Sequence, residues 1–527
     1  MATYRVGHDE FLIEDYARAR PFASFLPGIA GLWGVPMWVF YVNRGQAIAG
    51  FGIQDKEHPM MEFLPANRAY RTVPLHGFRT FLKFPGRRGD VYEPFGLTHP
   101  KPDDSVVRRR MRIRMHELVL EETHRRLGVE TRVQYFTIPN EPIAALARVV
   151  SITNRSRTAR PLEILDGLPL IIPYGMLDRF LKSMSRTIEA WVTVTNLEQQ
   201  APFYRLKAEP HDRPEVVPIR AGNFFTGVAT VRDQTIPLRP IIDPSLIFGL
   251  REDCVWPEAF AARAFRAPDR QFASDKTPCA MGYLKTTLEA GSTCPLVSFY
   301  GHAESQAQLI LLLPTLRDPS FAIRKAQENE RLIRELTDAV TTQSGCPTFD
   351  LYCRQTFLDN ALRGGVPVTF SGPSPSEAPK VLYVYARKHG DLERDYNHFV
   401  IPATPFSQGN ANYRDVNQNR RSDVWFSPQI GEHNIITFFN LLQADGFNPL
   451  VYKGTRYRVA DHLDAAPSLR EVLAKSFTPG ELLKHIERRH LKLSQSPEEL
   501  LRQIMPIAHE ILDAEHGEGF WIDHWTY

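Results

Sequence analysis

One carboxylate lies among aromatic side chains near the last residue of the 527-residue chain, in the order Trp521-Ile522-Asp523-His524-Trp525. Indole rings pack against the apolar faces of pyranose sugars, and a carboxyl group beside them loses hydration, which raises its pKa toward that of a general acid. The alternative is a core cluster of tryptophans in which Asp523 caps nearby backbone. From residue types alone, this core cluster is slightly preferred to the general acid.

A second polar run, residues 407–421, combines amides, hydroxyls and charges with one tyrosine. Its candidate ligand-binding side chains are Tyr413, Arg414, Asp415 and Gln418. Groups that both donate and accept hydrogen bonds suit a hydroxyl-rich ligand, because each sugar hydroxyl does the same. A polar loop that bonds to itself and to helix ends has the same composition. The sequence gives these two interpretations equal weight.

Basic and apolar side chains alternate in residues 108–116, which read Arg-Arg-Arg-Met-Arg-Ile-Arg-Met-His. A period of two indicates a strand with one wet and one dry face, although clustered arginines also occur in nucleic-acid-binding proteins. Because the chain has 63 basic and 60 acidic residues, its net charge of +3 gives no support to a nucleic-acid partner. We predict a half-buried strand here and no nucleic-acid partner.

Glycine and aromatic residues are concentrated in residues 21–38. Glycine lets a backbone approach a ligand closely. However, this segment has neither the Gly-Lys-Ser ending of a phosphate loop nor the spacing of a dinucleotide-binding loop. The preferred interpretation is a turn-rich entry to a core strand.

Several classes of protein gain no support from the sequence. Five cysteines at irregular spacing favour neither a disulfide framework nor a zinc ribbon, and the histidines lack the one-turn pairing of a zinc helix. No apolar run approaches the length of a membrane span, and the charged N-terminus lacks the apolar core of a signal peptide. We therefore predict no metal, no membrane contact and a cytoplasmic location.

Short apolar or alternating runs, separated by Gly, Pro and Asn, dominate the first three hundred or so residues. Examples are residues 37–42, 143–152, 187–195 and 309–313. Many short strands without helical spacing predict a large antiparallel β-sandwich over residues 1–315. Apolar residues then recur at helical spacing among charges in residues 320–340, which predicts a helical linker over residues 316–345.

Helical signals dominate the rest of the chain, with helices predicted over residues 349–363, 434–443 and 468–475. Two capping boxes begin at Thr478 and Ser496, and each has Pro after the N-cap and Glu two residues later. The second predicted helix includes Leu512 and ends near Gly517, so we expect Asp523 in a loop beyond it. With no closing element after Asp523, we expect a truncated enzyme.

These features together resemble the inverting glycoside phosphorylases of glycoside hydrolase family 94 and its relatives. The resemblance rests on the sandwich, the linker helix, the Tyr-Arg-Asp segment at residues 413–415 and the Trp-x-Asp pattern at residues 521–523. Residues 22–63 and 407–421 are most similar to the larger β-1,3-glucan phosphorylases of this group. The resemblance covers nearly the whole chain.

The resemblance implies a fold and roles for particular residues. In such enzymes a β-sandwich precedes an (α/α)6 barrel, so residues 346–527 would form the first half of a barrel. The general acid follows the Tyr-Arg-Asp segment by about a hundred residues, and Arg414 and Asp523 are 109 residues apart here. Asp523 would be that acid, Trp521 and Trp525 walls of the sugar site, and Arg414 with Asp415 ligands of sugar hydroxyls.

The chain also departs from the family pattern. Asn419 stands where these enzymes commonly carry a second acid. The family's phosphate-binding His, Thr and Gly would lie beyond Tyr527. The loop at residues 28–34 resembles one that reaches the neighbouring subunit's active site in family dimers, so the resemblance leaves room for a homodimer.

The activity implied is phosphorolysis of a β-glucosidic bond with inversion, giving α-glucose 1-phosphate from a β-1,3-gluco-oligosaccharide or a cellobiose-like substrate. Inorganic phosphate is then a co-substrate, and no cofactor is needed. The alternatives are an inverting β-glucan hydrolase and a carbohydrate-binding protein without turnover. Because half a barrel leaves apolar helix faces uncovered, we expect this fragment alone to be inactive or prone to aggregation.

Overall fold

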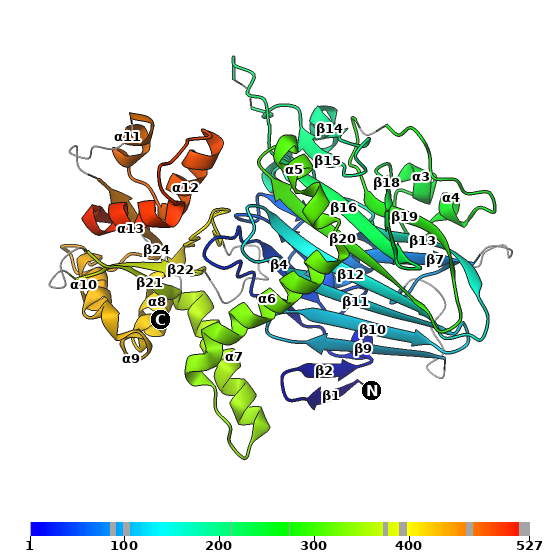
Figure 1. The fold of residues 1–527 in the computed structure, drawn as a ribbon, viewed down its shortest axis with the longest axis horizontal. Coiled ribbons are helices and arrows are strands. Elements are labelled where there is room, and N and C mark those ends of the chain that lie inside the picture. The colour runs from blue at the N-terminus through cyan, green and yellow to red at the C-terminus, as the bar shows by residue number, and fades with distance from the viewer. Residues whose placement is uncertain are drawn as a thin grey trace.

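The computed structural model describes residues 2–84, 91–97, 106–211, 213–272, 274–372, 378–388, 398–459 and 467–515. Strands dominate as far as Ala303, and most of the helices follow. Figure 1 shows the β-rich part on the right and a mixed part on the left, with helices α6 (Pro319–Thr337) and α7 (Pro347–Gly364) between them.

The largest sheet has eleven strands, and its neighbouring strands pair antiparallel. In sheet order they are β1 (Thr3–Val6), β2 (Phe11–Glu14), β9 (Val107–Ile113), β10 (Leu118–His124), β11 (Val129–Thr137), β12 (Ala144–Asn154), β20 (Thr293–Ala303), β16 (Gly222–Val231), β15 (Phe203–Leu206) and β14 (Val192–Thr195), with β17 (Gln234–Pro237) paired to β16. This sheet supplies the frame of the β-rich part.

Two smaller antiparallel sheets share a core with the largest one. They are β18 (Arg239–Ile241), β19 (Ala280–Leu288), β13 (Arg160–Leu168), β7 (Arg79–Lys83) and β8 (Val91–Tyr92), and β3 (Ala23–Phe25), β4 (Trp38–Val42), β5 (Ile48–Gly52) and β6 (Pro59–Met61). Val133, Ile164 and Trp38, one from each sheet, are fully buried in a single apolar cluster. The large antiparallel sheets predicted for this part of the chain are therefore present, while the boundary at residue 315 stays a prediction.

A buried polar cluster joins the largest sheet to the five-stranded one. Arg148 on β12 donates to both carboxylate oxygens of Asp166 on β13, at 2.7 and 3.0 Å, and neither side chain is exposed. The Thr80 hydroxyl on β7 donates to the same carboxylate at 2.6 Å. Because all these groups have partners, the ion pair is held in the core without an uncompensated charge.

One predicted strand is wrong, and another is correct only in its last four residues. Residues 309–313 lie in helix α5 (Gln306–Leu316), whose N-cap Ser305 accepts a hydrogen bond from the Gln308 amide. Leu309, Leu313 and Leu316 pack together against the largest sheet, so the apolar run covers the sheet instead of joining it. Residues 187–195 begin in a 3-10 helix, and only β14 is extended.

The predicted helices between the two parts are confirmed. Helix α6 begins after Asp318, whose side chain accepts from the Ser320 amide, and buries Phe321 and Ile333. Helix α7 ends at Gly364 and is followed by Gly365, whose φ of 88° is a conformation that glycine adopts readily. Side-chain capping therefore marks the start of α6, and a glycine marks the end of α7.

The remaining described residues mix helices with two small sheets. These elements are β21 (Val366–Phe370), β22 (Lys380–Val384), β23 (Ala411–Asn412), α8 (Tyr413–Arg420), α9 (Asp423–Phe426), α10 (His433–Asn440), β24 (Val451–Arg458), α11 (Pro467–Leu473), α12 (Pro479–Arg488), α13 (Pro497–Ile507) and β25 (His509–Glu515). Shorter helices within the β-rich part are α1 (Ala66–His76), α2 (Asp178–Ser183), α3 (Ser245–Phe248) and α4 (Glu258–Ala261). Because strands interrupt the helices, an (α/α)6 barrel over residues 346–527 stays a prediction.

Both capping boxes are confirmed, but the second helix is shorter than predicted. Thr478 and Ser496 each accept from the amide three residues later, and the glutamate there bonds back to the N-cap amide. Helix α13 ends at Ile507, and Leu512 lies on strand β25, where it packs with Ala514 at a strand period of two. Asp523 therefore follows a strand in sequence, not a helix as predicted.

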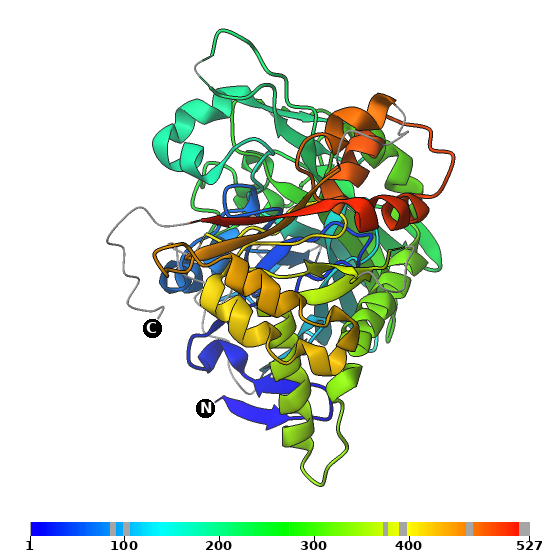
Figure 2. The same cartoon turned by 90° about the vertical axis from the view of Figure 1, so that its left-hand side faces the viewer.

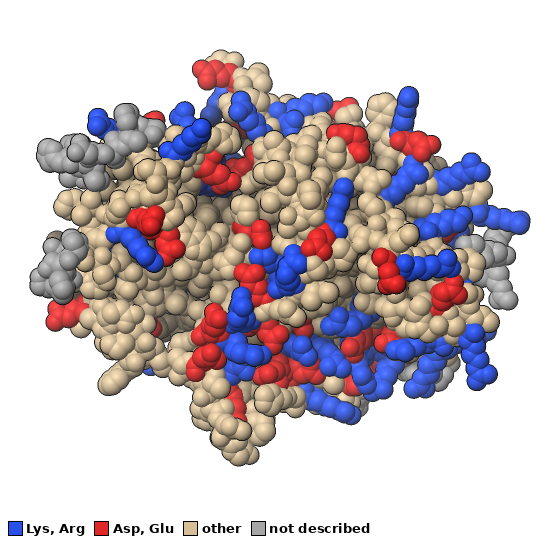
Figure 3. Space-filling model, in the orientation of Figure 1, with Lys and Arg blue, Asp and Glu red and all other residues tan. Residues whose placement is uncertain are grey.

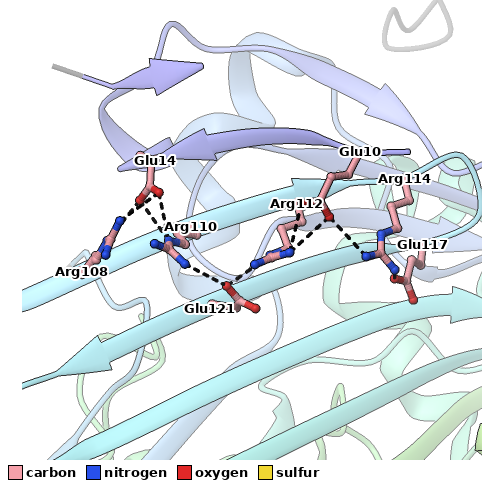
Figure 4. A network of polar contacts seen from close by, with 8 residues as sticks. All are labelled: Glu10, Glu14, Arg108, Arg110, Arg112, Arg114, Glu117 and Glu121. Carbon is pink, nitrogen blue, oxygen red and sulfur yellow. Dashed lines mark hydrogen bonds and ion pairs between the residues drawn. The ribbon is translucent and has the colours of Figure 1, made fainter. Parts of the chain in front are cut away.

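The alternating arginines from Arg108 to Arg112 lie on strand β9, as predicted, but the strand ends at Ile113, before the last three residues of the predicted run. Glu14 lies 3.1 Å from Arg108 and 3.0 Å from Arg110, and Glu10 and Glu121 continue this ladder of ion pairs toward Arg114 (Figure 4). Figure 3 shows acidic and basic side chains intermingled over this part of the surface. Because carboxylates neutralise the arginines, the strand offers no exposed row of positive charge to a nucleic acid.

Among the described residues, no helix combines the length and the apolar character needed to span a membrane.

Candidate functional site

A three-stranded sheet brings together two segments that are distant in the sequence. Val451 on β24 is in register with Asn412 on β23 and with Glu515 on β25. Adjacent strands lie about 4.8 Å apart, which places Glu515 roughly 10 Å from the start of α8. Figure 2 shows the red strand β25 beside β24, with α8 and α10 below this pair in the view.

Three of the predicted site residues fall outside the described residues. These are Asp523 and the two tryptophans, Trp521 and Trp525. The last described residue, Glu515, precedes Asp523 by eight residues. The roles given to these three side chains therefore stay predictions.

Half of the predicted polar loop is helix α8, which has two distinct faces. Val416 and Arg420 are buried, with 0% and 1% of each residue exposed. Arg414 is 41% exposed, and Asn417 and Gln418 are exposed one turn farther along. Because positions three and four apart share a helix face, these side chains form one hydrogen-bonding surface.

Tyr413 and Asp415 have mainly structural contacts. The Tyr413 hydroxyl donates to the carbonyl of Phe438 at 3.0 Å, and the two rings meet edge to face. The Asp415 carboxylate accepts a hydrogen bond from the side-chain amide of Asn412 at 3.2 Å and lies 3.6 Å from the Arg414 guanidinium. Tyr413 therefore anchors α8 to α10, while Asp415 fixes the start of the helix beside Arg414.

Asn419 is bonded within the helix. Its side-chain amide donates to the Asp415 carbonyl one turn earlier, at 2.7 Å. The side chain of Asn419 is therefore held against its own helix.

A cluster that the sequence interpretation missed lies behind α8. The guanidinium of Arg420 stacks 3.6 Å from the ring centre of Tyr383 and donates to the Gly364 carbonyl. Asn434 donates to the Tyr383 hydroxyl at 2.8 Å, and the ring of His433 stacks on that of Tyr383. In the sequence, Arg420 lies near the end of the polar segment and Asp423 two residues after it.

Burial controls the ionisation of this cluster. It raises the pKa of Asp423 to about 6, although a hydrogen bond from Tyr383 and the charge of Arg420 oppose the shift. Burial also lowers the pKa of His433 to about 4, and Arg420 adds to this effect. Near neutral pH the imidazole is therefore neutral and the carboxyl is close to its titration range.

Three buried polar atoms of this cluster have no hydrogen-bond partner among the described residues. They are Arg420 Nη1, Asp423 Oδ2 and Asn434 Oδ1. Buried polar atoms are normally satisfied by protein or water, so these atoms are open to a water or to polar groups of a ligand.

Large apolar side chains are exposed on α9 and α10. Trp425, Ile435 and Phe439 are 82%, 63% and 70% exposed. In Figure 3 the lower left of the surface, over these helices, is mostly uncharged.

The described residues, with the gaps given above, contain no group of three or more His, Cys, Asp and Glu side chains arranged to hold a metal ion.

No family model and no curated protein matches this chain. Solved structures similar to it include a family GH92 inverting mannosidase from Bacteroides thetaiotaomicron VPI-5482, with a TM-score of 0.28 and 10% identity over 68% of this chain and 41% of that one. A proposed kojibiose phosphorylase from the human microbiome has a TM-score of 0.27 and 8% identity, over 69% and 39% of the two chains. A family GH92 α-mannosidase from Bacteroides thetaiotaomicron has a TM-score of 0.28 and 11% identity, over 90% and 56%.

The chain thus spans 39% to 56% of the length of these structures. Similarities at these TM-scores and identities do not support a conclusion about the fold or function of this chain.

Proposed function

We propose that this chain is part of a carbohydrate-active enzyme that phosphorolyses β-glucosidic bonds with inversion. The observation that supports the proposal is the register of β23, β24 and β25. This register places Glu515, which precedes Asp523 by eight residues, roughly 10 Å from the helix that carries Arg414. Eight extended residues span at most about 28 Å, so the proposed acid is within reach of the α8 surface.

In the proposed mechanism, Asp523 donates a proton to the leaving glycosidic oxygen while inorganic phosphate attacks the anomeric carbon from the opposite face. Phosphate is already anionic near neutral pH, so no catalytic base is required. An inverting hydrolase instead needs a second carboxylate, about 6.5 to 9.5 Å from the acid, to activate water. A single committed carboxylate suits a phosphorylase better than a hydrolase.

The residues of α8 take different parts in this proposal. Arg414, Asp415 and Gln418 would bind sugar hydroxyls, because they lie on or beside its hydrogen-bonding face. Trp521 and Trp525 would form apolar walls of the site. Tyr413, which is bonded to the Phe438 carbonyl, would hold the helix in place and not contact the sugar. A cytoplasmic location and a homodimer belong to the same proposal.

The first test measures what the full-length protein releases from candidate substrates. We expect phosphate-dependent release of α-glucose 1-phosphate from laminari-oligosaccharides or from cellobiose, and the substrate that reacts identifies the linkage. Asp523→Asn should abolish turnover while sugar binding, measured by calorimetry, remains. Glucose released without sugar phosphate would establish a hydrolase instead.

A second variant tests the α8 surface. Gln418→Ala should weaken sugar binding by about 1 kcal/mol, the value of a typical hydrogen bond. Gln327→Ala removes an exposed glutamine from α6 and is the matched control, which should leave binding unchanged. If wild type and Asp523→Asn bind sugar equally and neither turns it over, the chain is a carbohydrate-binding protein.

A further inference from the structure

A small cavity lies between the glycine-rich loop that precedes β4 and the segments that lead to α8. Its volume is about 10 Å³, and its lining includes Gly28, Ile29, Tyr385, Arg387 and Ser407. A volume of this size holds one water-sized ligand.

Arg387 brings a positive charge to this cavity. The residue is 3% exposed, and its Nε has no hydrogen-bond partner among the described residues. It forms no ion pair with any residue that the structure describes, although Asp359 on α7 acts on it at longer range. Burial lowers the pKa of the guanidinium to about 10, which still leaves it protonated near neutral pH.

The glycine-rich loop is shaped to lie close to this guanidinium. Gly28 has a φ of 65°, and a Cβ there would lie 2.3 Å from the Met37 carbonyl and 3.4 Å from Arg387 Nη1. The other wall is fixed by backbone bonds, in which the Tyr385 amide donates to the Ser407 carbonyl at 2.8 Å. The cavity is therefore built from both parts of the chain.

We propose that this cavity binds one halide ion, chloride under ordinary conditions, as the counter-ion of Arg387. A buried charge without a partner is strongly unfavourable, and a neutral water would hydrate the guanidinium without neutralising it. A monatomic anion is compact and supplies the missing negative charge. The Phe406 amide donates to the Leu32 carbonyl at 2.7 Å beside the cavity, so the ion would reinforce the contact between the loop and the chain leading to α8.

The first test compares the thermal unfolding of the chain in chloride and in gluconate at equal ionic strength. A ligand that binds only the folded state stabilises it, so chloride should raise Tm by about 2 °C and the effect should saturate. Arg387→Met keeps the aliphatic stem and removes the charge. This variant should lose the chloride response and be no less stable than wild type in gluconate.

Arg331→Gln is the matched control, because it removes an arginine that is 69% exposed on α6. This variant should keep the full chloride response. The proposal is overturned if wild type has the same Tm in both salts, or if Arg387→Met responds to chloride as wild type does.

A second measurement locates the ion without any variant. Crystals soaked in bromide should show an anomalous peak within hydrogen-bond distance of Arg387 Nε. A water without anomalous signal at this position would refute the proposal, as would a carboxylate paired with the guanidinium. Neither measurement depends on the proposed phosphorylase activity.

Discussion

The buried pair of Arg148 and Asp166 shows how much a single residue can matter in this fold. Asp166→Asn would leave the guanidinium in the core without a counter-charge, and we expect a loss of about 3 to 5 kcal/mol in the free energy of unfolding. Replacing both partners, Arg148→Met with Asp166→Leu, should cost much less. Urea unfolding of the single and double variants measures this, and equal losses would contradict it.

Asp423 should make stability depend on pH. Its pKa is about 6 in the fold against an ordinary value of 3.8, so between these values the folded state keeps a proton that the unfolded chain releases. Stability contributed by this group therefore falls as the pH rises from about 4 to about 6. Asp423→Asn should stabilise the protein by up to about 2 kcal/mol at about pH 8 and change little at about pH 4. A pH-independent difference in the urea midpoint would contradict this assignment.

At the scale of helices and strands, the sequence predicted those elements that carry a strong local signal. The capping boxes at Thr478 and Ser496 each specify where their helix begins, and the alternating arginines of β9 specify a strand. The apolar run of α5 was misread, because a short buried helix and a buried strand have the same composition. Strand β25 was missed because only its pairing with β24, which is distant in the sequence, shows that residues 509–515 are extended.

At the candidate site, the sequence singled out Arg414 and Gln418 as ligand-binding side chains but did not predict the helix that carries them. Arg414 and Gln418 are four residues apart, so a helix places them on one face. The cluster of Tyr383, Arg420 and Asn434 could not be found in this way, because its members come from β22, α8 and α10. Only the tertiary fold brings such residues together.

Removal of a cap should have a measurable and local effect. Ser496→Ala leaves the first-turn amides of α13 without their acceptor, and we expect a loss of about 1 kcal/mol. Hydrogen exchange of α13 should become faster as well. Ser494→Ala, two residues earlier on the exposed surface, is the control and should change neither quantity.

At the scale of the whole molecule, the β-rich part and the mixed part are joined by more than the chain. Glu304, directly after β20, lies 2.5 Å from Lys484 and 2.8 Å from Arg488, both on α12. Lys484 also donates to the Ala403 carbonyl at 2.8 Å. This contact is partly buried, so the ion pairs are worth more here than pairs on an open surface.

Glu304→Gln should therefore weaken the junction in a pH-dependent way. Burial alone would raise the pKa of this carboxyl, but Lys484 and Arg488 hold it at about 2, below its ordinary value of 4.5. The stability it contributes is present above about pH 4.5 and is lost as the pH falls toward about 2. We expect the variant to lose about 2 kcal/mol at about pH 7 and much less at about pH 3, with faster hydrogen exchange in α12 at neutral pH.

The matched control is Glu498→Gln, which breaks an exposed pair with Arg502 within α13. A surface pair of this kind contributes less than about 1 kcal/mol, so the control should be nearly silent at both pH values. If both variants lost the same stability, or if the loss in Glu304→Gln did not change with pH, the carboxylate would have no special part in the junction. If instead only Glu304→Gln opens α12, the two parts of the chain are coupled through this ion pair, and the position of α12 relative to the β-rich part depends on it.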